Sequence, residues 1–247
     1  MVSCTLALES RWGPPQTVEE GLFRRVGRLG SSLDASSSGS ISYVTERPPQ
    51  PAPVEKECEV SRRLLLHICC GPCSTYTIKR LRELGFDVTG YWYNPNVHPY
   101  TEHERRRSCL EEYAATVGLP MIWEPDYDMP AYFRAVAGHE KFGERCARCY
   151  DLRLRATART ASERGFGVIT TTLLISPYQD QQLIVAVGEE AAAEFGVDFF
   201  FENFRRGWSE RGRLAKEHNL YRQAYCGCIF SEWERYDQNA STRQRGG

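Results

Sequence analysis

The length, composition and charge of the chain exclude several classes of protein. Its 247 residues allow one domain with appendages, and a hydrophobic content of 41% is sufficient for a packed core. Because 31 Lys and Arg nearly balance 32 Asp and Glu, the formal net charge of −1 does not indicate an obligate nucleic-acid binder. No apolar run approaches the roughly 20 residues that span a bilayer, and no secretory signal is visible, so we expect a cytoplasmic protein without a membrane segment.

The first part of the chain differs in composition from the rest. A serine-rich tract over 31–42 is followed by four prolines between positions 48 and 53. Such a segment buries too little apolar surface to offset its ordering entropy, which predicts a disordered extension over 1–60. We expect one α/β domain over 61–238 and a flexible tail over 239–247.

Strands and helices alternate regularly within the predicted domain. Apolar runs predict strands at 64–68, 88–93, 121–123, 167–172 and 197–201. Helical spacing, with a glycine after several of the segments, predicts helices at 74–84, 101–117, 150–164 and 180–195, and short ones at 209–218 and 229–236. This order predicts a Rossmann-like parallel sheet with helices on both faces. Ligand sites in such folds lie beyond the carboxyl ends of the strands, and the first cysteine motif lies at such an end.

Ten cysteines are present, and seven of them fall in three short motifs. These are Cys69-Cys70-Gly71-Pro72-Cys73, Cys146-Ala147-Arg148-Cys149 and Cys226-Gly227-Cys228. Cysteines this close either chelate a soft metal or exchange electrons through disulfides. In a reducing compartment, metal binding or catalysis is favoured over a structural disulfide framework.

The first two motifs supply five candidate thiolates. Cys70-Gly71-Pro72-Cys73 spells the thioredoxin active site, but the preceding Cys69, the additional clustered cysteines and the long alternation of strands and helices oppose that interpretation. Cys146-x-x-Cys149 lies just before a predicted helix and is shared by zinc knuckles, disulfide enzymes and iron–sulfur sites. A closed zinc site or a 4Fe–4S cluster uses at most four thiolates, so the surplus indicates a cluster together with a second metal or a reactive thiol.

The third motif and two loops leave alternatives open. Cys226 and Cys228 are either an electron-relaying or redox-sensing pair, or two incidental thiols near a turn. The loops 91–99 and 173–180 follow predicted strands and carry aromatic, amide and hydroxyl side chains that could stack on a base and bond its edges. Asn-Pro and Ser-Pro also make turns and helix caps, which is the simpler interpretation for any single residue.

Five segments in order resemble the QueH-type epoxyqueuosine reductases. They are LLHICCGPC (65–73), YNPNVHP (93–99), CxxCYxxRL (146–154), TTLLISPY (171–178) and LYRQAYCGCIFS (220–231). The resemblance extends over about 62–236. It implies an iron–sulfur enzyme that reduces an epoxide on the modified wobble base of certain tRNAs, the last step of queuosine synthesis.

The same resemblance implies roles for individual residues. Cys69, Cys70, Cys146 and Cys149 match the metal-binding cysteines of the family, whereas some members carry Asp at the position of Cys73. The implied cofactors are a 4Fe–4S cluster and an adjacent mononuclear iron, and the implied partners are tRNA and an unidentified electron donor. The candidate residues of the base pocket are Tyr93, Asn94 and Ser176 for binding and His98, Tyr178 and Asp180 for catalysis. Cys226 and Cys228 are the candidate redox-active disulfide.

Two other classes remain open on the sequence. One is a thioredoxin-like dithiol oxidoreductase without iron, and the other is a zinc-stabilised RNA-binding module without a visible chromophore.

Overall fold

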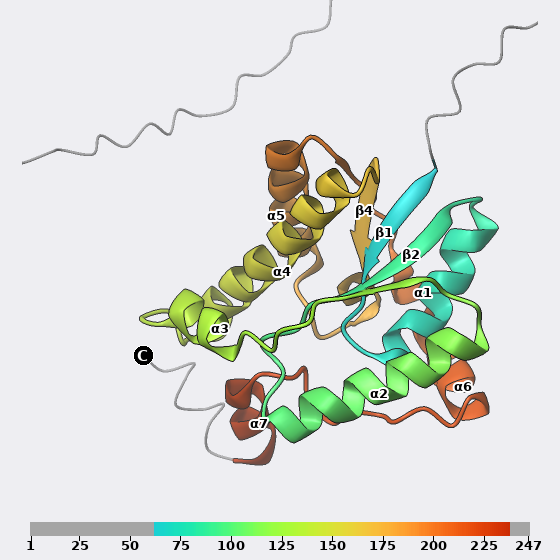
Figure 1. Cartoon of the computed structure of the whole chain (residues 1–247). Helices are drawn as coiled ribbons and strands as arrows, with labels where there is room; N and C mark the ends of the chain where they lie inside the picture. Colours follow the sequence, from blue (N-terminus) through green and yellow to red (C-terminus); the bar gives the residue numbers. More distant parts are fainter. Residues whose placement is uncertain (1–61, 238–247) are drawn as a thin grey trace, which may run out of the picture. The chain divides into compact units, whose positions relative to one another are not determined.

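The apolar run after Arg63 forms a strand at the centre of a parallel sheet (Figure 1). The structure, a computed structural model, describes residues 62–237. The predicted extension over 1–60, with Cys4 and Cys58, and the predicted tail over 239–247 lie outside the described residues. Strand by strand, the sheet consists of β1 (Arg63–His67), β2 (Asp87–Trp92), β3 (Met121–Trp123), β4 (Val168–Thr171) and β5 (Asp198–Phe199).

All four strand pairings are parallel, and the order is β3-β2-β1-β4-β5. Leu64, Leu65 and Leu66 of β1 are fully buried, as expected for a central strand that is covered on both faces. The chain moves outward from β1 in one direction through β2 and β3, then returns to pair β4 with the other edge of β1. The switch point between β1 and β4 is where open α/β sheets bind their ligands.

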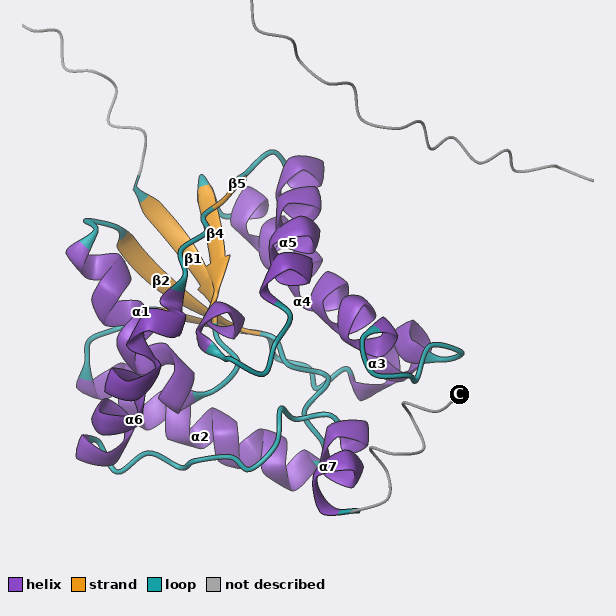
Figure 2. Cartoon of the chain, turned by 180° about the vertical axis from the view of Figure 1, so that it is seen from behind, coloured by secondary structure: helices purple, strands orange, loops and turns teal. Residues whose placement is uncertain are grey.

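Helices cover the sheet on both faces, which confirms the predicted fold class. They are α1 (Gly71–Glu83), α2 (Tyr100–Thr116), α3 (Met129–Val136), α4 (Glu144–Glu163), α5 (Gln181–Phe195), α6 (Trp208–Glu217) and α7 (Ile229–Tyr236), with the short 3₁₀ helices η1 (Thr172–Ile175) and η2 (Phe204–Gly207). Seen from both sides, α1 and α6 lie on one side of the sheet, and α4 and α5 on the other (Figures 1 and 2). No helix between residues 62 and 237 is long and apolar enough to cross a membrane.

Two helices that carry cysteines begin several residues earlier than the sequence predicted, and one further helix was not predicted. Helix α1 begins at Gly71 instead of position 74, because Pro72 is compatible with the first turn of a helix. Helix α4 begins at Glu144 instead of position 150, so the second cysteine motif lies on the first two turns of the helix and not before it. Helix α3 was not predicted; its start is marked by Asp128, whose side chain accepts from the amide of Ala131.

Candidate functional site

The first cysteine motif turns the chain from β1 into α1 at the switch point. Cys70 is the N-cap of α1, and its thiol lies 3.8 Å from that of Cys69. The thiol sulfurs of Cys69, Cys70 and Cys73 all lie within 4.8 Å of one another. Thr172, at the end of β4, accepts a hydrogen bond from the Cys69 amide at 3.0 Å and donates one to the Cys69 thiol at 3.3 Å.

The three thiols of this motif differ in the direction in which their pKa values are shifted. Hydrogen bonds from Cys70 and Cys73, with a further one from Thr172, hold the pKa of Cys69 well below its usual range. Burial raises the pKa of Cys70, and the hydrogen bond to Cys69 raises that of Cys73 to about 12. The motif thus favours a thiolate on Cys69, which is the form that ligates a metal.

The second motif lies on one face of α4. Cys146 and Cys149 are three residues apart, so their side chains are neighbours on the helix surface. Burial raises the pKa of Cys149 to about 11, while the guanidinium of Arg153 opposes that shift. Arg153 is itself buried and donates from Nε to the carbonyl oxygen of Cys149 at 3.1 Å.

The third motif precedes α7 and comes from the far end of the domain. The sulfurs of Cys226 and Cys228 are 4.0 Å apart, and both residues are free thiols. Cys228 is the N-cap of α7 and accepts from the amide of Ser231 at 3.4 Å. Hydrogen bonds from Cys226 and Ser231 lower the pKa of Cys228 to about 4.

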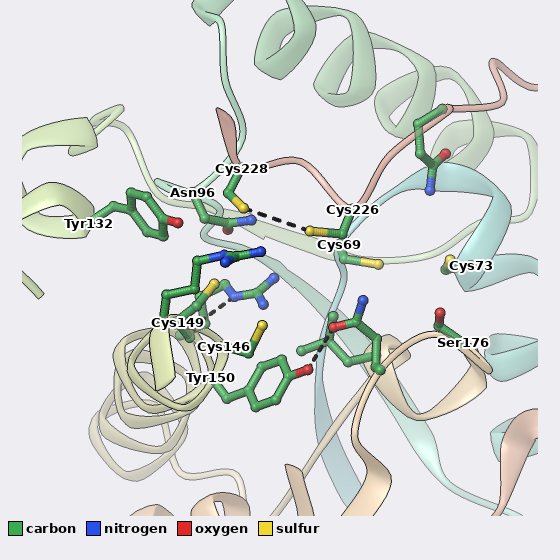
Figure 3. Close-up of a pocket in the computed structure, with 15 residues that line it drawn as sticks. Cys69, Cys73, Asn96, Tyr132, Cys146, Cys149, Tyr150, Ser176, Cys226 and Cys228 are labelled. Atoms are coloured by element: carbon green, nitrogen blue, oxygen red, sulfur yellow. Dashed lines mark hydrogen bonds between the residues drawn. The ribbon is translucent and has the colours of Figure 1, made fainter. Parts of the chain in front are cut away.

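The three motifs line one cavity of about 70 Å³. Figure 3 shows labelled thiols of all three motifs pointing toward this hollow from different segments. Its lining includes six cysteines and otherwise polar, aromatic and aliphatic side chains: Cys69, Cys73, Cys146, Cys149, Cys226 and Cys228, with Asn96, Tyr132, Arg145, Tyr150, Arg153, Leu173, Ser176, Gln179 and Gln223. Cys70 is not part of this lining, but its thiol accepts from Nε2 of the lining residue Gln223 at 2.8 Å.

The other residues predicted for the base pocket are placed differently. Ser176 lines the cavity, and Tyr178 lies close along the chain but is 78% exposed. Asp180 caps α5 by accepting from the amide of Leu183 at 3.1 Å, and it does not line the cavity. The sequence-based alternative of a helix cap therefore describes Asp180.

Three predicted residues lie in the loop after β2, and two of them, Asn94 and His98, form hydrogen bonds with the backbone of other segments. Asn94 is buried and donates to the carbonyl oxygen of Ile68 at 2.9 Å, which ties this loop to the end of β1. Tyr93 is half-buried and stacks on Tyr91 with ring centroids 6.4 Å apart. His98 is buried and accepts from the amide of Ile229 through Nδ1 at 3.3 Å.

Several cavity residues received no role in the sequence-based prediction. The hydroxyl of Tyr150 donates to Oε1 of Gln179 at 2.7 Å, and burial raises its pKa. Arg145 is buried and donates to the carboxylate of Glu234 at 2.5 Å, which links α4 to α7. Tyr150 follows Cys146, and Arg153 follows Cys149, each by four residues on one helix, and this spacing is a sequence signal that could have identified them.

The fold and the cavity together define a redox or metal-binding protein that acts through clustered thiols. A family model described as "Epoxyqueuosine reductase QueH" matches residues 64–234. The chain belongs to this family of epoxyqueuosine reductases, which are oxidoreductases of queuosine biosynthesis.

Curated relatives carry the same description. The chain is 41% identical over 174 residues to "Epoxyqueuosine reductase QueH" of Dehalococcoides mccartyi, an alignment that covers 70% of this chain and 94% of the relative. It is 38% identical over 192 residues to the protein of the same name from Thermotoga maritima, covering 74% and 97%. A third such protein, from Streptococcus pyogenes, is 34% identical over 192 residues, covering 74% and 75%. The resemblance stated from the five motifs is confirmed.

Proposed function

We propose that the thiol-lined cavity is the active site of an epoxyqueuosine reductase that converts epoxyqueuosine to queuosine at the wobble position of tRNA. The observation that carries this proposal is the convergence of the three cysteine motifs on one cavity at the switch point of the sheet. Each of the three cysteine motifs therefore contributes thiols to the proposed site.

The donor set of the cavity fits an iron–sulfur centre. Soft thiolates select iron–sulfur clusters and zinc, and a cluster uses up to four of them. Cys69, Cys70, Cys146 and Cys149 would hold the cluster and an adjacent iron between them, with Cys73 as a fifth donor next to the same group. A cluster held by these residues would supply one-electron transfer, and an iron with an open position would supply Lewis-acid chemistry for an epoxide oxygen.

Buried positive charge supports the same assignment. Arg211 is buried and its Nη2 lies 3.7 Å from the sulfur of Cys73, while Arg153 lies next to Cys149. Thiolates taken out of water are costly unless they are paired with opposite charge. These two guanidiniums offset the negative charge of a multi-thiolate centre.

The two other functional classes fit the geometry less well. A thioredoxin-like enzyme needs an accessible dithiol, but Cys70 and Cys73 are 1% and 5% exposed. A closed zinc site needs four ligands around one ion, but among residues 62–237 the one group of three or more candidate ligand residues within 4.8 Å of one another is Cys69, Cys70 and Cys73. The separate cysteine motifs would be able to hold a centre with several metal atoms, because such a centre does not require all thiols to meet at one ion.

The chemistry requires two electrons and two protons for each epoxide. Two thiols supply both when they oxidise to a disulfide, because the epoxide oxygen leaves as water and the alkene forms. Cys226 and Cys228 are suited to this role because their sulfurs are neighbours, 4.0 Å apart. Oxidation would bring the two sulfurs together to the disulfide bond length of about 2.05 Å. An electron donor must then reduce the disulfide before the next turnover.

The remaining cavity residues position the base and its protons. The hydroxyl of Tyr150, held by Gln179, is a candidate proton donor to the departing oxygen. Ser176, which also lines the cavity (Figure 3), is a candidate hydrogen-bond partner of the base. Tyr93 and Asn94 lie in the loop after β2, and Asn94 ties this loop to the end of β1. Tyr178 offers an exposed ring on which an unstacked anticodon-loop base could lie.

One substitution tests the proposal directly. In protein purified without oxygen, Cys146→Ala should remove the visible absorbance of the cluster together with the deoxygenation of epoxyqueuosine-containing tRNA. Cys109→Ala is the matched control, because Cys109 lies on α2 and does not line the cavity. Wild-type activity in the Cys146 variant would reject the proposed site.

A further inference from the structure

The segment 225–229, which carries Cys226 and Cys228 and is called the dithiol segment below, is held by two residues far away in sequence. We propose that Arg106 and His98 are positioning residues that fix the dithiol segment at the cavity, so that both thiols face it in a geometry from which a disulfide can form. This inference rests on the proposed function for its catalytic meaning, and on the contacts below for its geometry.

Arg106 uses three of its nitrogens to hold three different acceptors. Its Nη1 donates to the carbonyl oxygen of Cys226 at 2.9 Å, and its Nη2 to that of Tyr225 at 3.2 Å. Its Nε donates to Oε1 of Glu102, one turn earlier on α2, at 2.7 Å. Only the planar fork of a guanidinium presents donors in these directions at once, and the single ammonium of lysine does not.

The ion pair of Arg106 is buried, which argues for a geometric use. Arg106 is 2% exposed and Glu102 is 9% exposed. Taking both charges out of water costs about as much as their attraction returns, so such a pair is weak evidence for stability. Glu102 also accepts from the hydroxyl of Tyr221 at 2.8 Å, which fixes the chain just before the dithiol segment.

His98 contacts the dithiol segment on both sides of Cys228. Its amide donates to the carbonyl oxygen of Gly227 at 2.8 Å, and its Nδ1 accepts from the amide of Ile229 at 3.3 Å. Its own carbonyl oxygen accepts from the hydroxyl of Tyr225. Because Nδ1 accepts, the neutral ring carries its proton on Nε2.

The second nitrogen of His98 does not point to a proton acceptor. Nε2 is buried and has no hydrogen-bond partner among residues 62–237. The ring lies against Tyr132 and Phe133, each with its centroid 5.0 Å away. Burial lowers the pKa of His98, which keeps the ring neutral and able to accept from Ile229. These contacts favour positioning over the proton donation that the sequence predicted.

The fit of the dithiol segment is close. A Cβ atom on Gly227 would lie 3.0 Å from Cγ2 of Val97, 3.1 Å from Nη1 of Arg106 and 3.3 Å from Nδ2 of Asn96. Three successive carbonyl groups, those of 225, 226 and 227, are thus hydrogen-bonded to α2 or to the loop before it. Fixing these carbonyl groups limits the directions in which the thiols of Cys226 and Cys228 can point.

Arg106→Lys in the iron-loaded enzyme tests this inference, with Arg107→Lys as the matched control. Arg107 is the next residue of α2, and its guanidinium lies over the ring of Trp123, away from the dithiol segment. In the reduced enzyme, Cys228 is 5% exposed, and we expect Arg106→Lys to raise its rate of alkylation by iodoacetamide at least tenfold, as read by peptide mass spectrometry.

A redox titration supplies a second readout that a purely structural role would not move. In glutathione buffers, Arg106→Lys should shift the equilibrium of Cys226 and Cys228 about tenfold toward the dithiol, which is about 30 mV for a two-electron couple. Iron content should remain at the wild-type value. A folded, iron-loaded Arg106→Lys with unchanged alkylation rate and unchanged potential would overturn the inference.

Substitutions at His98 keep the test decisive if Arg106→Lys does not fold. His98→Asn retains an acceptor near the position of Nδ1, whereas His98→Leu does not. We expect His98→Leu to expose Cys228 to alkylation and His98→Asn to restore its protection; equal alkylation in the two variants would contradict the proposal. Altered alkylation with unchanged multiple turnover would support the positioning of the thiols and reject their proposed role as electron source.

Discussion

The glycine between Cys226 and Cys228 allows a prediction whose magnitude follows from the structure. Gly227 has a backbone φ of +138°, a value that residues other than glycine rarely adopt. Imposing such a backbone on another residue costs about 1–3 kcal/mol. The new methyl of Gly227→Ala would also press on Val97, Arg106 and Asn96 at 3.0–3.3 Å, and crowding of this kind costs about 1–3 kcal/mol more.

We therefore expect Gly227→Ala to lose about 2–6 kcal/mol of unfolding free energy. With a urea dependence of about 1–3 kcal/mol per molar, the midpoint should fall by roughly 1 M or more. Urea titration of anaerobically purified protein, followed by tryptophan fluorescence, measures this shift. Alkylation of Cys228 in native buffer should also become faster, because the strain lies in the segment that carries this thiol.

Gly212→Ala is the matched control for this experiment. Gly212 lies inside α6, and a Cβ there would meet nothing within 4 Å. Alanine is the better helix former, so this variant should gain about 0.5–1 kcal/mol. If both variants shifted the midpoint upward, or if Gly227→Ala left it unchanged, the close seating of the dithiol segment would be refuted.

Three further predictions concern residues at or near the cavity. Cys226→Ser should retain wild-type iron content and slow multiple turnover of tRNA; loss of iron would instead make this thiol a ligand. Asp180→Ala should lose about 1 kcal/mol of stability because the cap of α5 is removed, and Asp180→Ser should restore it, with wild-type turnover per folded molecule in both. Because burial lowers the pKa of His98, the unfolded chain binds a proton at this residue before the folded chain does on acidification. The free energy of unfolding should therefore fall below about pH 6.5 by up to about 1.4 kcal/mol per pH unit, and it should fall less in His98→Asn. Urea midpoints measured from pH 7 to 5.5 follow this change. A steeper decline in His98→Asn would show that other groups dominate.

Local patterns account for most of the sheet and for the cysteine motifs. The run at 64–68 predicted the central strand because a strand buried on both faces is continuously apolar. The start of α4 was predicted six residues too late, because the charged stretch Glu144–Arg148 resembles a solvated loop when read without its neighbours. Helix α3 was missed because eight residues give little more than two turns of periodicity.

The sequence by itself determined the parallel α/β class, the three thiol motifs and the family, because apolar periodicity and residue spacing are properties of neighbouring positions. Only the tertiary structure decided that Arg106 holds the carbonyl groups around Cys226 and that Arg211 lies against the buried thiol of Cys73. Contacts between residues more than a hundred positions apart depend on how helices and loops pack around the switch point of the sheet, and no local pattern in the chain encodes that packing.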